Sequence, residues 1–168
     1  MIIDYKGAYP TRDVQQVRLI EGHSFSTGYV RTFADPLPAN NSIDIALAFP
    51  ENINPIITIT GLCGGNAMAY LYENAVVTGG TSIPIINRNR SSTITSESVA
   101  LANPTVTSTG TLIISEILTG GVGKKGGGAE AGGSTLILKG ATAYLFRLTN
   151  EDATNTPHAT EIILTWTE

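Results

Sequence analysis

The densest group of polar side chains in the sequence is Asn87-Arg88-Asn89-Arg90. Two arginines spaced two apart project in the same direction from an extended segment, and each offers five N–H donors in a planar fork. Such a pair binds carboxylates of a neighbouring subunit, or it binds backbone carbonyls of a long loop within its own subunit. We therefore treat residues 87–90 as a candidate interface, with a loop clamp inside the same subunit as the alternative.

A second pattern, Gly121-Val122-Gly123-Lys124-Lys125-Gly126, matches the letters of a dinucleotide-binding loop. That loop works only when a helix opens directly after it, because the N-terminus of the helix holds the pyrophosphate. More glycines follow here, and no Ser or Thr follows the lysines as a P-loop requires. We expect no cofactor, and we expect residues 119–133, which hold 8 of the 18 glycines, to form a flexible loop.

The residues that commonly carry catalysis are few and scattered. His23 and Ser24 are adjacent, but neighbours on a strand point to opposite faces. His158 follows Thr156-Pro157 in a polar turn, where we expect it to be solvated, and the single cysteine, Cys63, is expected to be a small buried hydrophobe. One cysteine and two histidines provide little for a metal site. The sequence therefore predicts neither an enzyme nor a metal protein.

Charge and hydropathy exclude further classes. Charged residues make up 14% of the 168 residues and the net charge is −4, without the basic excess of a nucleic-acid-binding protein. No apolar run approaches the length of a membrane span, and the first residues lack the layout of a signal peptide. We expect no nucleic acid and no membrane as partners. A surface with so few charges favours contact with other protein.

The elements that position these residues read as strands. Threonine, isoleucine and valine supply 49 residues, and their β-branched side chains favour a pleated sheet. Period-two alternation and turn signals predict nine or ten short strands, one of them at 14–20 and another at 92–99, with a long connection at 74–91. We predict an all-β single domain, a β-sandwich over 14–168 of jelly-roll type, preceded by an extended N-terminal arm over 1–13.

Three stretches in a fixed order carry a family likeness. The stretch AYLYE at 69–73 is followed by GTSIPIINRNRS at 80–91, and then by KGATAYLFRLTN at 139–150 with LTWTE at the end. This order resembles small virion proteins of tailed phages, some of which are capsid decoration, or cement, proteins. The Asn-Arg-Asn-Arg stretch is the most specific part, and the likeness covers residues 15–168.

The resemblance implies a sandwich or jelly-roll subunit, often trimeric, bound to the outside of an icosahedral shell near its three-fold positions. The expected partners are two further copies of the chain and the major capsid protein. The expected location is the exterior of a virion assembled in the host cytoplasm. In this interpretation Tyr5, Tyr9 and Pro10 of the arm and the loop at 87–90 are candidate contacts between subunits or with the coat.

Two other functions stay open. One is a receptor- or carbohydrate-binding module of a phage fibre or appendage, with aromatic side chains that stack on a glycan. The candidate aromatic residues for this module are Tyr70, Tyr72, Tyr144 and Trp166, although these positions also suit core residues. The other is a polysaccharide hydrolase or lyase on a sandwich scaffold, which would need two facing carboxylates. The candidate carboxylates for this enzyme are Glu73, Glu97, Glu116 and Glu161.

Overall fold

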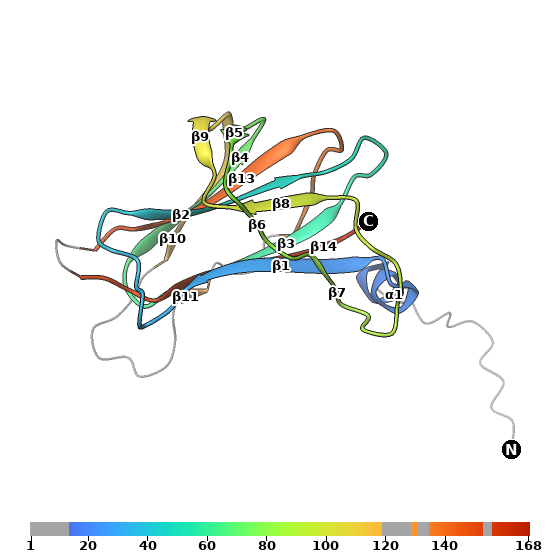
Figure 1. The fold of residues 1–168 in the computed structure, drawn as a ribbon, viewed down its shortest axis with the longest axis horizontal. Helices are drawn as coiled ribbons and strands as arrows, with labels where there is room; N and C mark the ends of the chain where they lie inside the picture. Colours follow the sequence, from blue (N-terminus) through green and yellow to red (C-terminus); the bar gives the residue numbers. More distant parts are fainter. Residues whose placement is uncertain (1–13, 119–128, 131–134, 153–155) are drawn as a thin grey trace, which may run out of the picture.

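The computed structural model describes residues 14–118, 129–130, 135–152 and 156–168 of the chain (Figure 1). Within this part the chain forms one short helix and antiparallel strands that build two large sheets and one small one. The first large sheet is composed of β1 (Ser24–Arg31), β3 (Ile56–Cys63), β7 (Ile86–Asn87), β11 (Ala129–Glu130), β12 (Thr135–Ile137) and β14 (Thr160–Thr167). The second is composed of β2 (Ser42–Ala48), β4 (Ala67–Glu73), β6 (Thr81–Ser82), β8 (Val99–Ala102), β10 (Thr111–Leu118) and β13 (Ala143–Asn150).

The strand order is that of a jelly roll. Neighbouring strands in the first sheet follow the order β1-β14-β3-β12, and those in the second follow β2-β13-β4-β10. Two four-stranded antiparallel sheets connected in this way form the jelly-roll sandwich. The short strands β7, β8 and β6 extend the two sheets on the opposite side. The predicted all-β, single-domain sandwich is therefore confirmed, and the strand order agrees with the predicted jelly-roll type.

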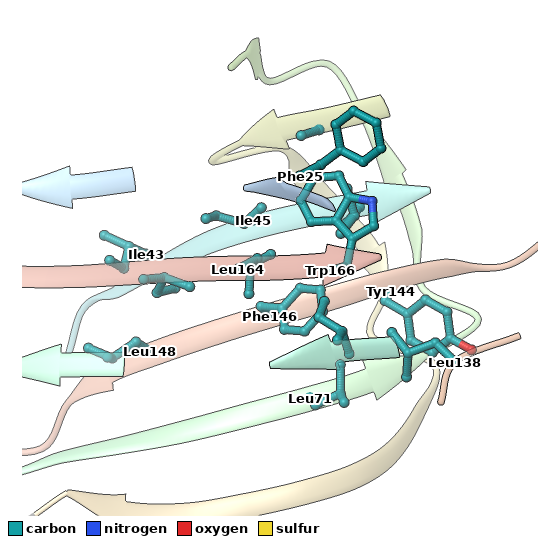
Figure 2. Packing of buried hydrophobic residues seen from close by; sticks show 14 of the residues in the cluster. Phe25, Ile43, Ile45, Leu71, Leu138, Tyr144, Phe146, Leu148, Leu164 and Trp166 are labelled. Atoms are coloured by element: carbon teal, nitrogen blue, oxygen red, sulfur yellow. The ribbon is translucent and has the colours of Figure 1, made fainter. Parts of the chain in front are cut away.

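The core lies between the two large sheets. Alternate residues of β14 and β13 point inward, and three of them, Leu164, Trp166 and Phe146, are at most 1% exposed (Figure 2). The ring of Trp166 lies 6.2 Å from that of Phe25 and 6.1 Å from that of Phe49, centroid to centroid. Tilted and edge-on arrangements of this kind are the favoured geometry of aromatic pairs. The period-two pattern of the sequence thus arises from one buried face on each sheet.

A small third sheet covers part of the outer face of the second sheet. It consists of β5 (Val76–Thr78) and β9 (Thr105–Ser108). Its side chains Val77 and Val106 pack on Leu145, which is fully buried although it points away from the main core. The segment 74–91, predicted as a long connection, therefore contains three short strands, β5, β6 and β7.

The prediction of a strand at 14–20 is wrong, because the chain forms the helix α1 (Val14–Glu21) there. Apolar residues at Val14, Val17 and Ile20 have the three-residue spacing of one helix face. Gly22 has a left-handed φ of 83°, its N–H donates to the Leu19 carbonyl, and the His23 N–H donates to the Arg18 carbonyl. This is a Schellman ending, for which glycine is the favoured residue.

The prediction of a strand at 92–99 is also wrong, since β8 begins only at Val99. Serine side chains in this segment bond to its own backbone instead of leaving the backbone to a sheet. The Ser92 hydroxyl oxygen accepts the Ile94 N–H, and the Ser96 hydroxyl oxygen accepts the Ser98 N–H, both at 3.1 Å. The hydroxyls of Ser96 and Ser98 also donate to the Glu168 carboxylate, which holds the segment against the end of β14.

Two predicted segments fall outside the part of the chain that the structure describes. The N-terminal arm over 1–13 lies outside it entirely. The glycine-rich loop over 119–133 lies outside it except for β11, whose residues Ala129 and Glu130 pair with Cys63 and Leu62. Among the described residues, no helix has both the length and the apolar character needed to cross a membrane.

Shortening an inward side chain of β14 should lower the stability of the protein more than shortening an outward one. Leu164 is fully buried and its neighbour Ile163 faces outward. We expect Leu164→Ala to lower the free energy of unfolding by about 3 kcal/mol, because it leaves a cavity in the core. Ile163→Ala should cost less than half as much. Urea denaturation followed by circular dichroism measures both variants, and equal losses would contradict the assigned register.

Candidate functional site

The asparagines of the predicted interface loop act as clamps inside the subunit. Asn87 Nδ2 donates to the carbonyl oxygens of Gly22 and Ile94, both at 2.8 Å. Asn89 Nδ2 donates to the Ile20 carbonyl at 2.9 Å. These bonds tie the end of α1 to the segment that follows β7 and satisfy carbonyls that the helix leaves open. Asn87 and Asn89 therefore form a loop clamp inside their own subunit, which was the alternative to an interface.

The two arginines of the same loop face solvent. The backbone N–H of Arg88 donates to the Ser24 carbonyl at 2.8 Å, and its Nη1 lies 3.3 Å from the Ser24 hydroxyl. Arg90 is exposed, and no described acidic side chain lies within ion-pair distance of either arginine. The clamped loop thus holds two positive charges at the surface near α1, where a partner can reach them.

The remaining candidate interface residues, Tyr5, Tyr9 and Pro10, lie outside the described residues. Their predicted role as contacts of an N-terminal arm therefore stays a prediction.

The four aromatic residues proposed for glycan stacking divide into two groups. Tyr144 and Trp166 are fully buried in the main core. The Tyr144 hydroxyl accepts the Lys139 N–H at 2.8 Å, and Trp166 Nε1 donates to the Glu168 carboxylate at 3.0 Å. Buried Tyr and Trp need such partners for their polar atoms. Tyr144 and Trp166 are therefore core residues, which was the alternative role that the sequence left open for them.

Tyr70 and Tyr72, in contrast, lie on the outer face of the second sheet. Both are half-buried, and their rings stack with centroids 5.9 Å apart and planes 26° apart. On the adjacent strand, Arg147 pairs directly with Tyr70 in the sheet register. Arg147 Nε and Nη2 donate to the two carboxylate oxygens of Asp44 on β2, each at 2.7 Å. We call these four residues, Tyr70, Tyr72, Arg147 and Asp44, the tyrosine–arginine platform.

The surroundings of the platform favour an ionised Arg147 and a protonated Tyr70. The hydrogen bonds to Asp44 are the main reason that the pKa of Arg147 is raised. Partial burial, followed by the nearby charge of Glu151 and by Tyr72, raises the pKa of Tyr70, although Arg147 acts in the opposite direction. At neutral pH the platform therefore presents the phenol hydroxyl of Tyr70 beside a guanidinium. A guanidinium has five N–H donors, and the two hydrogen bonds to Asp44, which we call the Asp44–Arg147 fork, use two of them. Donors therefore remain for a ligand.

The prediction that His158 is solvated is wrong. Its Nε2 lies 2.5 Å from Asp152 Oδ2, and both side chains are mostly buried. Asp152 also accepts the backbone N–H of Asn66 at 3.0 Å and its side-chain Nδ2 at 2.6 Å. Burial acts to raise the pKa of Asp152, but the hydrogen bonds from Asn66 and His158 outweigh it and hold that pKa below its ordinary value. We call Asn66, Asp152 and His158 the loop clasp, because it joins the turn after β3 to the segment after β13.

Cys63 lies next to this clasp at the end of β3. Its side chain is 1% exposed, and desolvation raises the pKa of its thiol, with the charge of Asp152 adding to the shift. A thiol is reactive mainly as the thiolate. The position therefore fits the predicted small buried hydrophobe and gives no nucleophile at neutral pH.

A pocket of about 480 Å³ opens where β1, β3 and β14 meet the loops. Its apolar wall includes Val30, Leu62 and the largely exposed Phe33. The Arg31 guanidinium at its rim forms an ion pair with Asp35 at 2.8 Å. The pocket thus offers an apolar surface with few polar groups to orient a small ligand.

The carboxylates considered for an enzyme have separate roles or positions. Glu73 forms an ion pair with Lys139 at 2.6 Å, and Glu161 lies on the outer face of the first sheet. Glu116 lies on β10 and Glu97 in the serine-rich segment before β8. Among the described residues, no group of three or more His, Cys, Asp or Glu side chains is placed to hold a metal ion.

Comparisons with protein-family models, with curated proteins and with solved structures found no match for this chain. The candidate site therefore rests on the geometry of the chain itself.

Sequence reasoning missed the loop clasp and the Asp44–Arg147 fork. Both include a contact between residues that are distant in the sequence, Asn66 with Asp152 in the clasp and Asp44 with Arg147 in the fork, and these become neighbours only through the fold. Asp44 and Arg147, for example, are 103 positions apart and meet because β2 pairs with β13. The alternation around each residue shows that it faces outward, but no local signal identifies its partner across the sheet.

The loop clasp should make stability depend on acid pH. Because the folded pKa of Asp152 is lowered, its contribution to stability is present above the ordinary carboxyl pKa and is lost as the pH falls through the folded value. We expect Asp152→Asn to cost about 1 kcal/mol at pH 7 and to lose less stability than the wild type on acidification from about pH 5 to pH 3.

Thermal unfolding at each pH measures this effect. Asp35→Asn is the matched control, because Asp35 forms only a surface ion pair, and its side chain is 72% exposed. Parallel pH profiles for wild type and Asp152→Asn would contradict the assignment of the clasp.

Proposed function

We propose that this chain is a virion structural protein that binds the outside of an icosahedral phage capsid as a decoration, or cement, subunit and forms a trimer. The observation that carries the proposal is the exposure of large apolar side chains on the edge strands of both sheets. Ile117 on β10 is 73% exposed and Ile137 on β12 is 74% exposed. Such residues favour a surface that other protein covers.

The composition of the surface supports the same proposal. With 14% charged residues, the chain has few groups that keep a free surface hydrated. Further large apolar side chains are exposed elsewhere, including Phe33 in the loop after β1 and Val76 on β5. Many weak apolar contacts suit a subunit that binds a repeating lattice, since the lattice multiplies each contact.

The arginine loop is the proposed polar part of the interface. Arg88 and Arg90 extend from a loop that Asn87 and Asn89 hold in place, so little conformational entropy is lost when the loop binds. Its resemblance to the Asn-Arg-Asn-Arg stretch of tailed-phage virion proteins supports the same role. Acidic groups of the coat or of a neighbouring subunit are the complementary partners.

Binding to shells tests this proposal. We expect the double variant Arg88→Ala/Arg90→Ala to bind undecorated tailed-phage shells about ten-fold more weakly than the wild type, because two charges at the edge of the interface are lost. The melting temperature should not change, since both side chains are exposed. Co-sedimentation of a concentration series with purified shells gives the affinity.

Lys139→Ala is the matched control for charge. Lys139 is exposed and distant in the chain from the arginine loop, and it makes only a surface ion pair with Glu73. If the wild-type protein binds none of the undecorated tailed-phage shells that are tested, the proposed function is contradicted. Equal binding of wild type and double variant would contradict the role of the loop alone.

A second candidate, a carbohydrate-binding module, is favoured by the tyrosine–arginine platform. Stacked outward-facing tyrosines beside a hydrogen-bonded guanidinium supply the two things that a sugar needs, an aromatic surface for its C–H groups and donors for its hydroxyls. The Asp44–Arg147 fork fixes the guanidinium in one orientation. We rank this function second, because Tyr72 also packs against the small third sheet.

An array of immobilised bacterial surface oligosaccharides tests the second candidate. If the wild-type protein binds a glycan, Tyr70→Ala should weaken that binding by about ten-fold through loss of stacking. Phe33→Ala is the control, because Phe33 is an exposed aromatic residue on another element. The absence of any bound glycan, or equal loss in both variants, would rule out the platform as a sugar site.

A further inference from the structure

The pocket of about 480 Å³ lies at one end of the outer face of the first sheet. Glu161 on β14 pairs with Val30 on β1 at one side and with Leu62 on β3 at the other. Residues directly opposite each other in an antiparallel pair point to the same face of the sheet. The three side chains therefore form one row, and all three residues line the pocket. A carboxylate thus stands between two aliphatic side chains in the floor of the pocket.

The loop after β1 forms a wall of this pocket. It carries Phe33, which lines the pocket and is 92% exposed. Two hydrogen bonds fix the loop, since the Asp35 N–H donates to the Thr32 carbonyl at 3.1 Å and Arg31 Nε donates to the Asp35 carbonyl at 3.0 Å. A structured turn therefore holds the aromatic ring at the pocket with most of its surface open to a ligand.

The charges within the pocket are not balanced. Arg31 also lines it, but its Nη2 forms an ion pair with the Asp35 carboxylate at 2.8 Å. Within the described part of the chain, no ion pair includes Glu161. The pocket therefore carries one uncompensated negative charge beside apolar walls. Such a charge attracts an opposite charge more strongly than it would in open water, because the apolar walls lower the local dielectric constant.

We propose that this pocket binds a small organic cation, namely an ammonium group on an aromatic or branched aliphatic body. The ammonium group pairs with the Glu161 carboxylate, while the body lies against Phe33, Val30 and Leu62. Small-molecule sites are mostly apolar, contain few polar groups and have volumes of about 300–1,000 Å³. The pocket has each of these properties, and its one uncompensated charge selects the sign of the ligand.

Other classes of ligand fit the pocket less well. An anion is repelled by the Glu161 carboxylate. A neutral apolar molecule removes water from that carboxylate without giving it a partner, which costs free energy. A metal ion needs several ligands, and among the described residues no group of three or more His, Cys, Asp or Glu side chains is placed to hold one. An organic cation satisfies both the charge and the apolar walls.

Cation binding goes beyond the proposed function and does not depend on a shell. The pocket adjoins Val30 near the end of β1, whereas the arginine loop bonds to Ser24 at the start of that strand. The two sites therefore use different surfaces. Because the test uses purified protein and small probes, its failure would leave the shell-binding proposal standing.

Three probes that share one aromatic ring test the sign of the ligand. At neutral pH, 2-phenylethylammonium, 2-phenylethanol and phenylacetate carry a positive, a neutral and a negative head group. We expect the wild-type protein to bind the ammonium with a dissociation constant of about 1 mM, about five-fold more tightly than the alcohol, and not to bind phenylacetate. Titrations followed by nitrogen–proton correlation NMR measure these affinities. The backbone amide signals of Val30, Leu62 and Ala159 should shift, because these residues line the pocket.

Two substitutions separate the charge of the pocket from its apolar wall. We expect Glu161→Gln to weaken ammonium binding about five-fold and to leave alcohol binding unchanged, whereas Phe33→Ala should weaken both alike. Glu97→Gln, the same change at an exposed position before β8, should affect neither probe. The NMR spectrum of each variant shows whether it is folded. Equal affinity of wild type and Glu161→Gln for the ammonium, tighter binding of phenylacetate, or no shifts at the pocket with any probe would overturn the proposal.

Discussion

Trp166 fills the space between the two large sheets, and the packing of the inner faces around it places every other feature of the molecule. Its strand, β14, pairs with β1 on one side and β3 on the other, while β13 pairs with β2 and β4. The last two long strands of the sequence are therefore the central ones, β14 in the first sheet and β13 in the second. The fold cannot close until the end of the chain is in place, and such long-range pairing is typical of slow-folding β proteins.

Because the inner faces are used by the core, any function must come from the outer faces, the edges and the loops. The outer face of the second sheet carries the tyrosine–arginine platform, and its edge carries the apolar strand β10. The end of the first sheet near α1 carries the clamped arginine loop. We propose these as surfaces for recognition and assembly, in keeping with a structural subunit and with a binding module, the two functions that we propose.

The sequence predicts the sheets well where burial alone decides the structure. The alternation at 43–49 and at 144–148 corresponds to β2 and β13, because alternate residues of each strand, such as Ile45 and Phe146, face the main core. The prediction fails where side chains form hydrogen bonds with backbone groups in place of a neighbouring strand, as the serines before β8 do. At α1 the deciding signals are a three-residue spacing and the following Gly22, which a search for alternation overlooks. Contacts such as Asp44–Arg147 depend on strand order, which no local pattern encodes.

The most direct test of the account is the mass of the purified protein by light scattering on a sizing column, over a dilution series. The account holds that exposed apolar side chains such as Ile117 and Ile137 are contact surfaces between proteins. It predicts a stable species of three times the 17.6 kDa mass of one chain. A protein that stays at 17.6 kDa over the whole concentration range would contradict it.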